Sequence, residues 1–206
     1  MLESGLISGT WGMACGRLPD ATRFVITPSG MDYRAITPND LPVVNLDAEL
    51  VEGTRRPSTE TPMIARVLAR RPDIGAIAHT HSTVATGFAA ARTPIPPVLA
   101  ELAEAIGGEV PCAEYARFGT VELAERVLAV AGEKRAVLLA HHGVIAFGET
   151  VEDATDAALV VEEAARVALV CRLLGGGDAL GVDEVAALRQ VHLTRYGQPR
   201  ESSGES

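Results

Sequence analysis

Four of the five histidines in this chain lie at the ends of two apolar runs, where their side chains could bind a metal ion. The run at residues 74–81 ends in His79 and His81, and the run at residues 136–142 ends in a His-His pair. Side chains two positions apart on a strand share one face, so His79 and His81 are expected to point the same way. A histidine at a strand end is also an ordinary polar cap. Two clusters placed alike nevertheless favour a site for zinc or a similar divalent ion, which imidazole nitrogens bind well.

The second cluster supplies a third candidate ligand, and we choose His142 over its neighbour His141. Gly143 follows His142 directly and permits a tight turn that would aim the neighbouring side chain inward. A catalytic zinc ion with three protein ligands keeps one position free for water or substrate. Three histidines therefore leave room for a carboxylate that acts either as a ligand or as a base.

Glu60 is the candidate carboxylate, because it lies in the segment Pro-Ser-Thr-Glu-Thr-Pro just before a predicted helix. The hydroxyls of Ser58 and Thr59 can cap that helix. They also place donors and free amides at the positive end of the helix dipole, where a phosphate binds favourably. An ordinary cap with an acidic first turn is the alternative interpretation. The turn at residues 27–30 is a second, weaker place where backbone amides could meet an anion.

Apolar runs alternate with helical patterns along the chain, which is typical of an α/β domain. We expect a single domain over residues 1–206, in which residues 175–206 form a linker, a short C-terminal helix and a polar tail. Strands are expected at residues 23–26, 41–46, 49–52, 74–81, 137–140 and 144–147. Helices are expected at residues 61–70, 82–91, 101–106, 121–130, 151–174 and 183–196, with Thr120 capping the fourth and a capping box at residues 150–153 opening the fifth.

The composition is that of a soluble globular protein of 206 residues, with 47% hydrophobic and 22% charged residues. No apolar run approaches the length that a membrane span needs, and the first residues lack the features of a secretory signal. Three widely spaced cysteines argue against a disulfide framework and suit a reducing cytoplasm. The net charge of −9 argues against nucleic acid or an anionic membrane as the main partner.

Short motifs in register over about residues 4–174 resemble the class II aldolase/adducin family. That family includes L-fuculose-phosphate aldolase and ribulose-5-phosphate 4-epimerase. The motifs are Gly-Leu-Ile-Ser-Gly-Thr at 5–10, Ile-Thr-Pro-Ser-Gly-Met-Asp-Tyr at 26–33, the segment 57–62, His-Thr-His-Ser at 79–82, Pro-Cys-Ala-Glu-Tyr at 111–115, Phe-Gly-Thr at 118–120 and His-His-Gly at 141–143.

The resemblance implies a three-layer α/β/α subunit with a central, mostly antiparallel sheet. It implies a homotetramer with active sites near the subunit interfaces. It also implies a divalent metal, Zn²⁺ or another ion such as Mn²⁺ or Co²⁺, on His79, His81 and His142. Glu60 matches the family's catalytic carboxylate, which can ligate the resting metal and acts as acid and base during turnover. The substrate phosphate would be held at positions matching Gly12, Ser29, Gly30, Ser58 and Thr59.

The implied activity is a metal-dependent lyase that cleaves a small phosphorylated ketose by a retro-aldol reaction, through a metal-stabilised enediolate. The alternatives are a dehydratase of the methylthioribulose-1-phosphate type, a sugar-phosphate 4-epimerase, and a non-catalytic adducin-like interaction domain. The three histidines argue against the last of these. A Schiff-base mechanism does not fit, because the only lysine, Lys134, lies in a polar turn between a predicted helix and strand.

Three departures from the family pattern bear on the substrate. Met13 stands where the family has an asparagine that contacts phosphate, so the anion site is expected to be weakened or reshaped. The fuculose enzyme has a proton-donating tyrosine in the segment matching 99–101, where this chain has Glu101. Glu101 resembles the acid/base glutamate of the dehydratase branch, or it is a surface residue of an amphipathic helix. The family's N-terminal helix of some 20 residues is missing, which indicates an upstream start or a differently capped edge.

Overall fold

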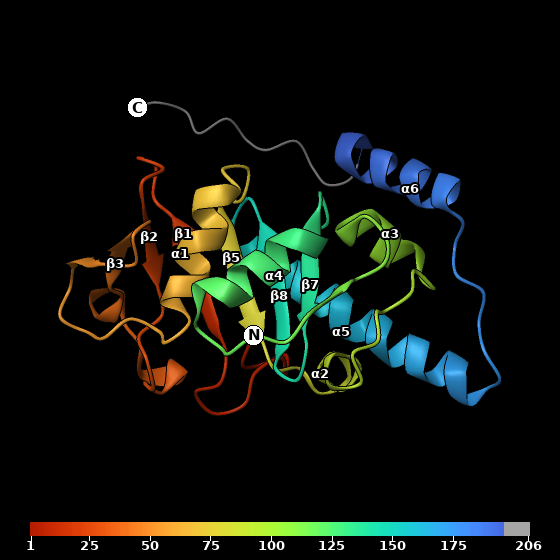
Figure 1. Cartoon of the computed structure of the whole chain (residues 1–206), viewed down its shortest axis with the longest axis horizontal. Helices are drawn as coiled ribbons and strands as arrows, with labels where there is room; N and C mark the ends of the chain where they lie inside the picture. The colour runs from red at the N-terminus through yellow and green to blue at the C-terminus, as the bar shows by residue number, and fades with distance from the viewer. Residues whose placement is uncertain (196–206) are drawn as a thin grey trace.

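One eight-stranded sheet runs through the molecule in the computed structural model, which describes residues 1–195 (Figure 1). The strand order is β4-β3-β2-β1-β5-β8-β7-β6, and every neighbouring pair is antiparallel except β6 and β7. The expected central, mostly antiparallel sheet is thus confirmed. The strands are β1 (Met13–Arg17), β2 (Arg23–Ile26), β3 (Val43–Asn45), β4 (Leu50–Glu52), β5 (Ala76–Thr80), β6 (Cys112–Ala113), β7 (Ala136–Leu139) and β8 (Gly143–Gly148).

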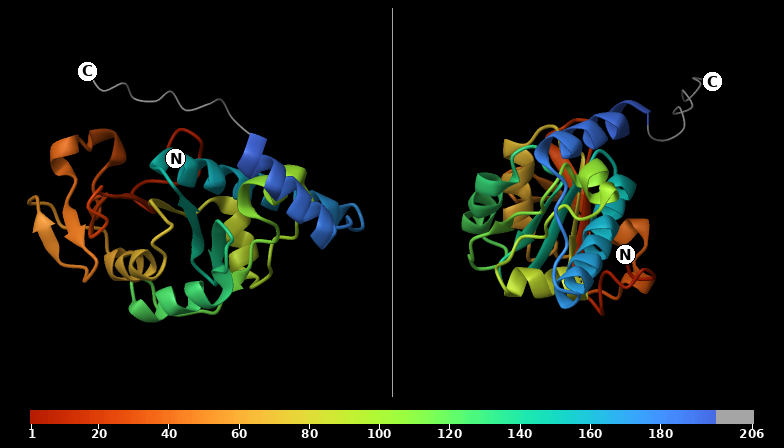
Figure 2. Two further views of the ribbon diagram at one scale, coloured as in Figure 1. Left: turned by 90° about the horizontal axis from the view of Figure 1, so that it is seen from above. Right: turned by 90° about the vertical axis from the view of Figure 1, so that its right-hand side faces the viewer.

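Helices cover both faces of the sheet, which confirms the expected three-layer α/β/α architecture (Figure 2). Helices α1 and α4 lie on one face, and α2, α3 and α5 lie on the other, with α6 packed on α3. Strands β2 to β4 form one end of the molecule and α3 and α6 the other (Figure 2, left). The helices are α1 (Thr61–Arg70), α2 (Thr83–Ala90), α3 (Ala100–Ile106), α4 (Val121–Ala131), α5 (Val151–Leu173) and α6 (Val182–Arg195), with short 3₁₀ helices at Tyr33–Ala35 and Pro38–Asp40.

The two faces of the central strand β5 belong to different cores. Ile77 packs into the core under α1 and α4, and Ala76 and Ala78 pack into the core under α2, α3 and α5. Strand alternation continues this pattern to the end of β5, so that His79 faces the same side as Ile77. Small alanine side chains on the second face let the long helix α5 approach the sheet closely, since α5 also presents alanines there.

Most predicted elements are found within one or two residues of their expected bounds. Thr120 caps α4 by accepting a hydrogen bond from the Leu123 amide, and Thr150 and Asp153 form the expected capping box of α5. The strand expected at 41–46 is shorter, at Val43–Asn45. The end of the last expected helix and the polar tail lie outside the described residues.

Two strands were not predicted. Strand β1 contains Ala and Gly at alternate positions, which gives it little β propensity, and it forms because β2 and β5 supply hydrogen-bonding partners on both sides. Strand β6 has only two residues and depends on parallel pairing with β7. Both are therefore defined by tertiary contacts. Within residues 1–195, the helices fall short of the length and apolarity needed to cross a membrane.

Candidate active site

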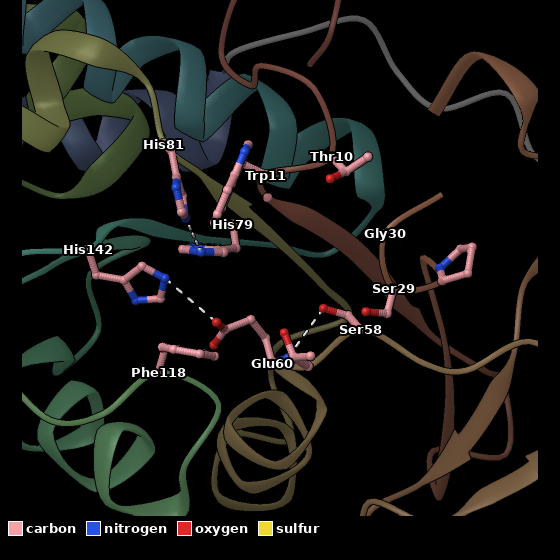
Figure 3. A pocket seen from close by; sticks show the side chains of 13 residues that line it. Thr10, Trp11, Ser29, Gly30, Ser58, Glu60, His79, His81, Phe118 and His142 are labelled. Atoms are coloured by element: carbon pink, nitrogen blue, oxygen red, sulfur yellow. Dashed lines mark hydrogen bonds and ion pairs between the residues drawn. The ribbon is translucent and has the colours of Figure 1, made fainter. Parts of the chain in front are cut away.

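A pocket opens where β5 ends and β8 begins, and most of the candidate residues line it (Figure 3). His79 comes from β5, His142 from the turn before β8, and Glu60 from the start of α1. Segments 10–12, 28–30 and 58–59 complete the wall on the other side. Together with Phe118, the pocket thus collects residues from six separate parts of the chain.

The three predicted metal ligands meet at one point of this pocket. The Nε2 atoms of His79 and His81 lie 2.9 Å apart, and the ring of His142 lies 4.7 Å from that of His79 and 5.0 Å from that of His81. One nitrogen from each ring lies within 4.8 Å of the others. Tetrahedral zinc ligands at about 2.0–2.1 Å from the ion are separated from one another by about 3.3 Å. The donor set and its spacing therefore fit a divalent ion.

His79 is held by the sheet itself. It is buried on the central strand, where it pairs with Met13 of β1 and Ile145 of β8. Its Nδ1 atom lies 2.8 Å from the carbonyl oxygen of Val144, which accepts a hydrogen bond from an Nδ1–H group. This contact selects the tautomer with a free Nε2 lone pair, which points into the pocket and is available to a metal.

His142 is aimed by the tight turn between β7 and β8. The residue that takes the left-handed conformation in this turn is His141, with φ of 58°, while Gly143 already belongs to β8. Gly143 is needed for a different reason than turn formation. A Cβ atom at this position would lie 2.4 Å from the carbonyl oxygen of Thr80 and 3.0 Å from the ring of His81. The absence of a side chain there allows the histidines to converge.

The expectation that His81 shares a strand with His79 is wrong, although the two rings do meet. Strand β5 ends at Thr80, and His81 lies in the connection to α2. The sheet ladder therefore does not set the position of His81, and other contacts must do so.

Burial keeps the three imidazoles neutral at physiological pH. Loss of solvent lowers the pKa of His142 from 6.5 to about 4, with a smaller contribution from His81. Burial likewise lowers the pKa of His79 well below its ordinary value, assisted by the other two histidines, and lowers that of His81. A neutral imidazole has the lone pair that a metal needs, so the site is prepared for a cation.

Glu60 lies beside the histidines at the N-cap position of α1. One carboxylate oxygen is 3.6 Å from Nε2 of His142, and the other accepts a hydrogen bond of 3.0 Å from the Gly119 amide. Burial raises the pKa of the Glu60 carboxyl, and the Gly119 hydrogen bond opposes this rise. A buried carboxyl whose proton is held more tightly than in water is suited to act as a general acid or base.

Three of the predicted phosphate-binding residues, Ser29, Gly30 and Ser58, lie at the opposite side of the pocket from His142 (Figure 3). Segments 27–30 and 56–58 are joined by hydrogen bonds from the Ser29 amide to the Arg56 carbonyl (2.9 Å) and from the Ser58 amide to the Thr27 carbonyl (3.1 Å). The pocket lining includes Gly12, Ser29, Gly30, Ser58 and Thr59.

Among residues 1–195, no lysine or arginine lines the pocket. An anion there would depend on hydroxyl groups, free backbone amides and the positive end of the α1 dipole. The cap differs from the expected one in detail, because the Ser58 hydroxyl accepts a hydrogen bond of 3.3 Å from the Glu60 amide while Glu60 is the N-cap residue. The assignment of these residues to phosphate stays a prediction.

Two residues singled out in the sequence lie away from the pocket wall. Glu101 is exposed in the first turn of α3 and does not line the pocket of its own chain. Met13 is fully buried beside His79 in the core under α1 and α4. The expected effect of Met13 on the anion site stays a prediction, and any such effect would act through the packing of β1.

Two aromatic residues of the pocket had no role in the sequence interpretation. The Trp11 ring is 67% exposed and lies 6.1 Å from the ring of His81. The Phe118 ring is 55% exposed and lies 6.3 Å from that of His142. The Tyr33 hydroxyl donates a hydrogen bond to the Gly12 carbonyl and so anchors the segment that carries Trp11. The Trp11 and Phe118 rings give the pocket apolar walls beside the three histidines. The position of Trp11 between Gly9 and Gly12 is the sequence signal that could have predicted such a wall.

Three neutral imidazoles beside a buried carboxylate, on an α/β/α scaffold, form a group that could hold a divalent metal ion. Comparison with known proteins gives the family. The family described as class II aldolase and adducin N-terminal domain matches residues 1–169. The chain therefore belongs to this family, and relatives named as aldolases and epimerases identify it as an enzyme.

Individual relatives cover nearly the whole chain. The 5-methylthioribulose-1-phosphate/5-deoxyribulose-1-phosphate aldolase of Rhodospirillum rubrum is 38% identical over 193 residues, which is 94% of this chain and 86% of the relative. The L-ribulose-5-phosphate 4-epimerase of Salmonella paratyphi A is 33% identical over 184 residues, with 84% and 81% covered. A solved structure of L-fuculose 1-phosphate aldolase superposes with a TM-score of 0.88 at 34% identity, covering 92% of this chain and 89% of that one.

Proposed function

We propose that this protein is a divalent-metal-dependent aldolase that cleaves a small ketose phosphate between two carbon atoms. The observation that carries the proposal is the convergence of His79, His81 and His142, with Nε2 of His142 3.6 Å from a carboxylate oxygen of Glu60. Zinc is the ion that we assign, because three neutral imidazoles with a free fourth position are a common catalytic zinc site.

Each group has a task that its surroundings support. A divalent ion on the three imidazoles supplies Lewis-acid polarisation of a carbonyl group. Glu60 would hold or release the proton at the reacting carbon, since its raised pKa favours proton exchange. The amide of Gly119 keeps the carboxylate oriented towards His142. Ser29, Ser58 and Thr59, with the amides before α1, would bind the phosphate and so position the substrate.

The aromatic walls favour a substrate with an apolar end. Trp11 and Phe118 flank the histidines, and apart from the indole N–H of Trp11 their rings offer a sugar hydroxyl no hydrogen-bonding group. The relative from R. rubrum is named for ketose 1-phosphates that end in a methyl or methylthio group. We therefore infer a 5-deoxy or 5-methylthio ketose 1-phosphate as the substrate class.

The epimerase and the dehydratase are the competing reactions. A 4-epimerase is supported by the name of the Salmonella relative, and a dehydratase by the acidic side chain of Glu101 where a tyrosine stands in the fuculose enzyme. Glu101 does not line the pocket of its own chain, so an acid/base role for it requires the site of a neighbouring subunit. We infer a cytoplasmic homotetramer of single-domain subunits, with sites near the interfaces, as the assembly in which such a contact could form.

Incubation of the zinc-reconstituted protein with ketose 1- and 5-phosphates tests the proposal. Aldolase activity predicts dihydroxyacetone phosphate from the 5-deoxy and 5-methylthio ketose 1-phosphates, together with the matching aldehyde. Loss of water without carbon–carbon cleavage would establish the dehydratase, and interconversion of pentulose 5-phosphates would establish the epimerase. Failure to retain any divalent ion after reconstitution would favour the non-catalytic, adducin-like interpretation.

A further inference from the structure

Of the three candidate ligands, His81 is the one whose position the sheet does not determine. His79 is fixed by strand pairing on both sides. His142 is fixed by a tight turn, in which its own amide donates a hydrogen bond of 2.9 Å to the Leu139 carbonyl. His81 lies one residue after β5 and two residues before α2. Its place therefore depends on what holds the start of α2.

The start of α2 lacks the side-chain cap that its own sequence would supply. Ser82 is the N-cap residue, but its hydroxyl makes no capping hydrogen bond and is buried without a partner among the described residues. An N-cap side chain normally accepts a hydrogen bond from the amide two or three positions later. At α2 those amides belong to Val84 and Ala85, and another element serves them.

That element is α5, which packs against α2 and carries Glu162 in its middle (Figure 1). Glu162 is only 5% exposed. One carboxylate oxygen accepts a hydrogen bond of 3.1 Å from the Val84 amide, and the other accepts one of 2.9 Å from the Ala85 amide. The guanidinium of Arg166, one turn along α5, donates to the first oxygen at 3.2 Å.

A carboxylate in this position is favoured by charge as well as by hydrogen bonding. It lies at the positive end of α2, and it satisfies two amides that burial would otherwise leave without partners. Burying the carboxylate costs free energy that these contacts offset. An ordinary core residue on the alanine-rich face of α5 would avoid that cost, so the charge at position 162 points to a specific task.

We propose that Glu162 is a positioning residue for the metal site, which fixes the start of α2 and thereby the location of His81. It does not touch the metal or the substrate. It connects the core helix α5 to the segment that carries His81, through the amides of Val84 and Ala85. The inference rests on the proposed metal-binding function and concerns only the ion itself, so that substrate identity does not enter.

The decisive variant is Glu162→Gln, which keeps the size of the side chain but offers one acceptor oxygen instead of two. Zinc affinity of the metal-free protein is measured by competition with a chromogenic chelator, and the visible absorption of the Co²⁺-loaded protein reports ligand geometry. We expect zinc affinity to fall about tenfold or more, as for other residues that orient metal ligands, and the Co²⁺ spectrum to change.

Thr150→Ala is the matched control. It removes a side-chain cap from α5, where the Thr150 hydroxyl accepts a hydrogen bond of 3.1 Å from the Asp153 amide, and this helix start follows β8 at the end away from the histidines. It should lower the Tm of the metal-free protein and leave zinc affinity within about twofold of wild type, because no ligand depends on that cap. Arg166→Met, which leaves both amide contacts of Glu162 in place, should likewise leave zinc affinity unchanged.

Zinc affinity of Glu162→Gln within about twofold of wild type would overturn the inference and reduce Glu162 to a helix cap. If Glu162→Gln does not fold at 25 °C, Glu162→Asp replaces it, with an expected loss of about threefold or more against Thr150→Ala. Unchanged zinc affinity in Glu162→Asp would then overturn the inference in the same way. A wild-type protein that binds no zinc would overturn the proposed function and this inference together. If the wild-type protein binds zinc and Glu162→Gln binds it with the same affinity, this inference alone would be overturned.

Discussion

Single side chains at the site differ from ordinary surface residues in how far burial has changed their chemistry. His142 and Glu60 lie 3.6 Å apart, and burial lowers the pKa of the imidazole while it raises that of the carboxyl. Both changes favour the neutral form of the group. The imidazole of His142 therefore stays neutral and keeps the lone pair that a cation needs, and the Glu60 carboxyl holds a proton more readily than it would in water.

Replacement of the carboxyl at position 60 separates proton transfer from metal binding. Glu60→Gln keeps the acceptor for the Gly119 amide but removes the exchangeable proton, so we expect kcat to fall about 10²- to 10⁴-fold with zinc content unchanged. Steady-state kinetics and metal analysis measure the two effects. Glu125→Gln is the control. It removes the ion pair between Glu125 of α4 and Arg66 of α1 and should leave kcat near wild type. Full activity of the Glu60 variant would exclude it as the acid/base.

Trp11 offers a test of the inferred substrate class. Trp11→Ala removes an apolar wall, so the KM for a 5-methylthio ketose 1-phosphate should rise about tenfold, or about 1.4 kcal/mol, with little change for a hydroxylated ketose. Trp11→Phe keeps the wall and is the control. Trp11 is the only tryptophan of the chain, so its fluorescence in the wild type should respond directly to added substrate analogue. An equal rise of KM for both substrates would argue against recognition of an apolar end.

At the level of elements, the site depends on how closely separate segments can approach. The first residue of β8 lies against the end of β5, and segment 118–120 lies against the start of α1. Glycines stand at both contacts. A Cβ atom at Gly119 would lie 2.3 Å from the Thr59 carbonyl oxygen, and the φ of 68° there is itself unfavourable for other residues. These contacts bring Glu60 and His142 into one pocket.

The first contact gives a prediction at this scale. Gly143→Ala would place a methyl group 2.4 Å from the Thr80 carbonyl oxygen, so β5 and β8 must separate and carry His79 and His142 apart. We expect a stability loss of about 1–3 kcal/mol, measured by urea denaturation, and weakened zinc binding. Gly87→Ala is the control, since a Cβ atom there meets nothing within 4 Å and alanine favours a helix by about 0.5–1 kcal/mol. Unchanged zinc affinity in Gly143→Ala would show that the strands can adjust without moving the ligands.

On the scale of the whole molecule, the candidate metal site lies at the end of the central strand β5, between two hydrophobic cores. Strand β5 lies between β1 and β8 and contributes to the cores on both faces of the sheet. Histidines buried in such a place must remain neutral while the protein is folded. The stability of the metal-free protein should therefore depend on pH.

The direction of this dependence follows from the three histidines. Their pKa values are lowered in the folded protein, that of His142 to about 4, so between pH 6.5 and 4 the unfolded chain binds protons that the folded protein does not. Acidification in this window therefore favours unfolding. The raised pKa of Glu60 acts in the opposite direction, but it is one group against three.

We expect the Tm of the metal-free protein to fall steadily from pH 7.5 to 5.0, as measured by differential scanning calorimetry. Added zinc should raise the Tm at pH 7.5, because it binds only the folded state. In the variant His142→Asn the fall in Tm with decreasing pH should be shallower, since one titrating group is gone. A Tm independent of pH over this range in the wild type would contradict the assignment of buried neutral histidines.

The sequence by itself determined the local structure and the inventory of the site. Proline and hydroxyl residues defined the start of α1 and the caps of α4 and α5, because these signals act within a few residues. The paired histidines predicted a metal site, and the three predicted ligands lie together in the structure; the short motifs identified the family and the three-layer fold. All of these depend on residue type and spacing along the chain.

Only the tertiary structure decided how these parts meet. Strands β1 and β6 exist because neighbouring strands pair with them. His81 was predicted to lie on the same strand as His79, but it lies after the end of β5 and still meets the other two histidines. Contacts between Glu162 and α2, or Trp11 and His81, join residues that are 70 or more positions apart. No local pattern can specify such contacts, because they form when chain segments pack, and packing depends on the shape of the whole core.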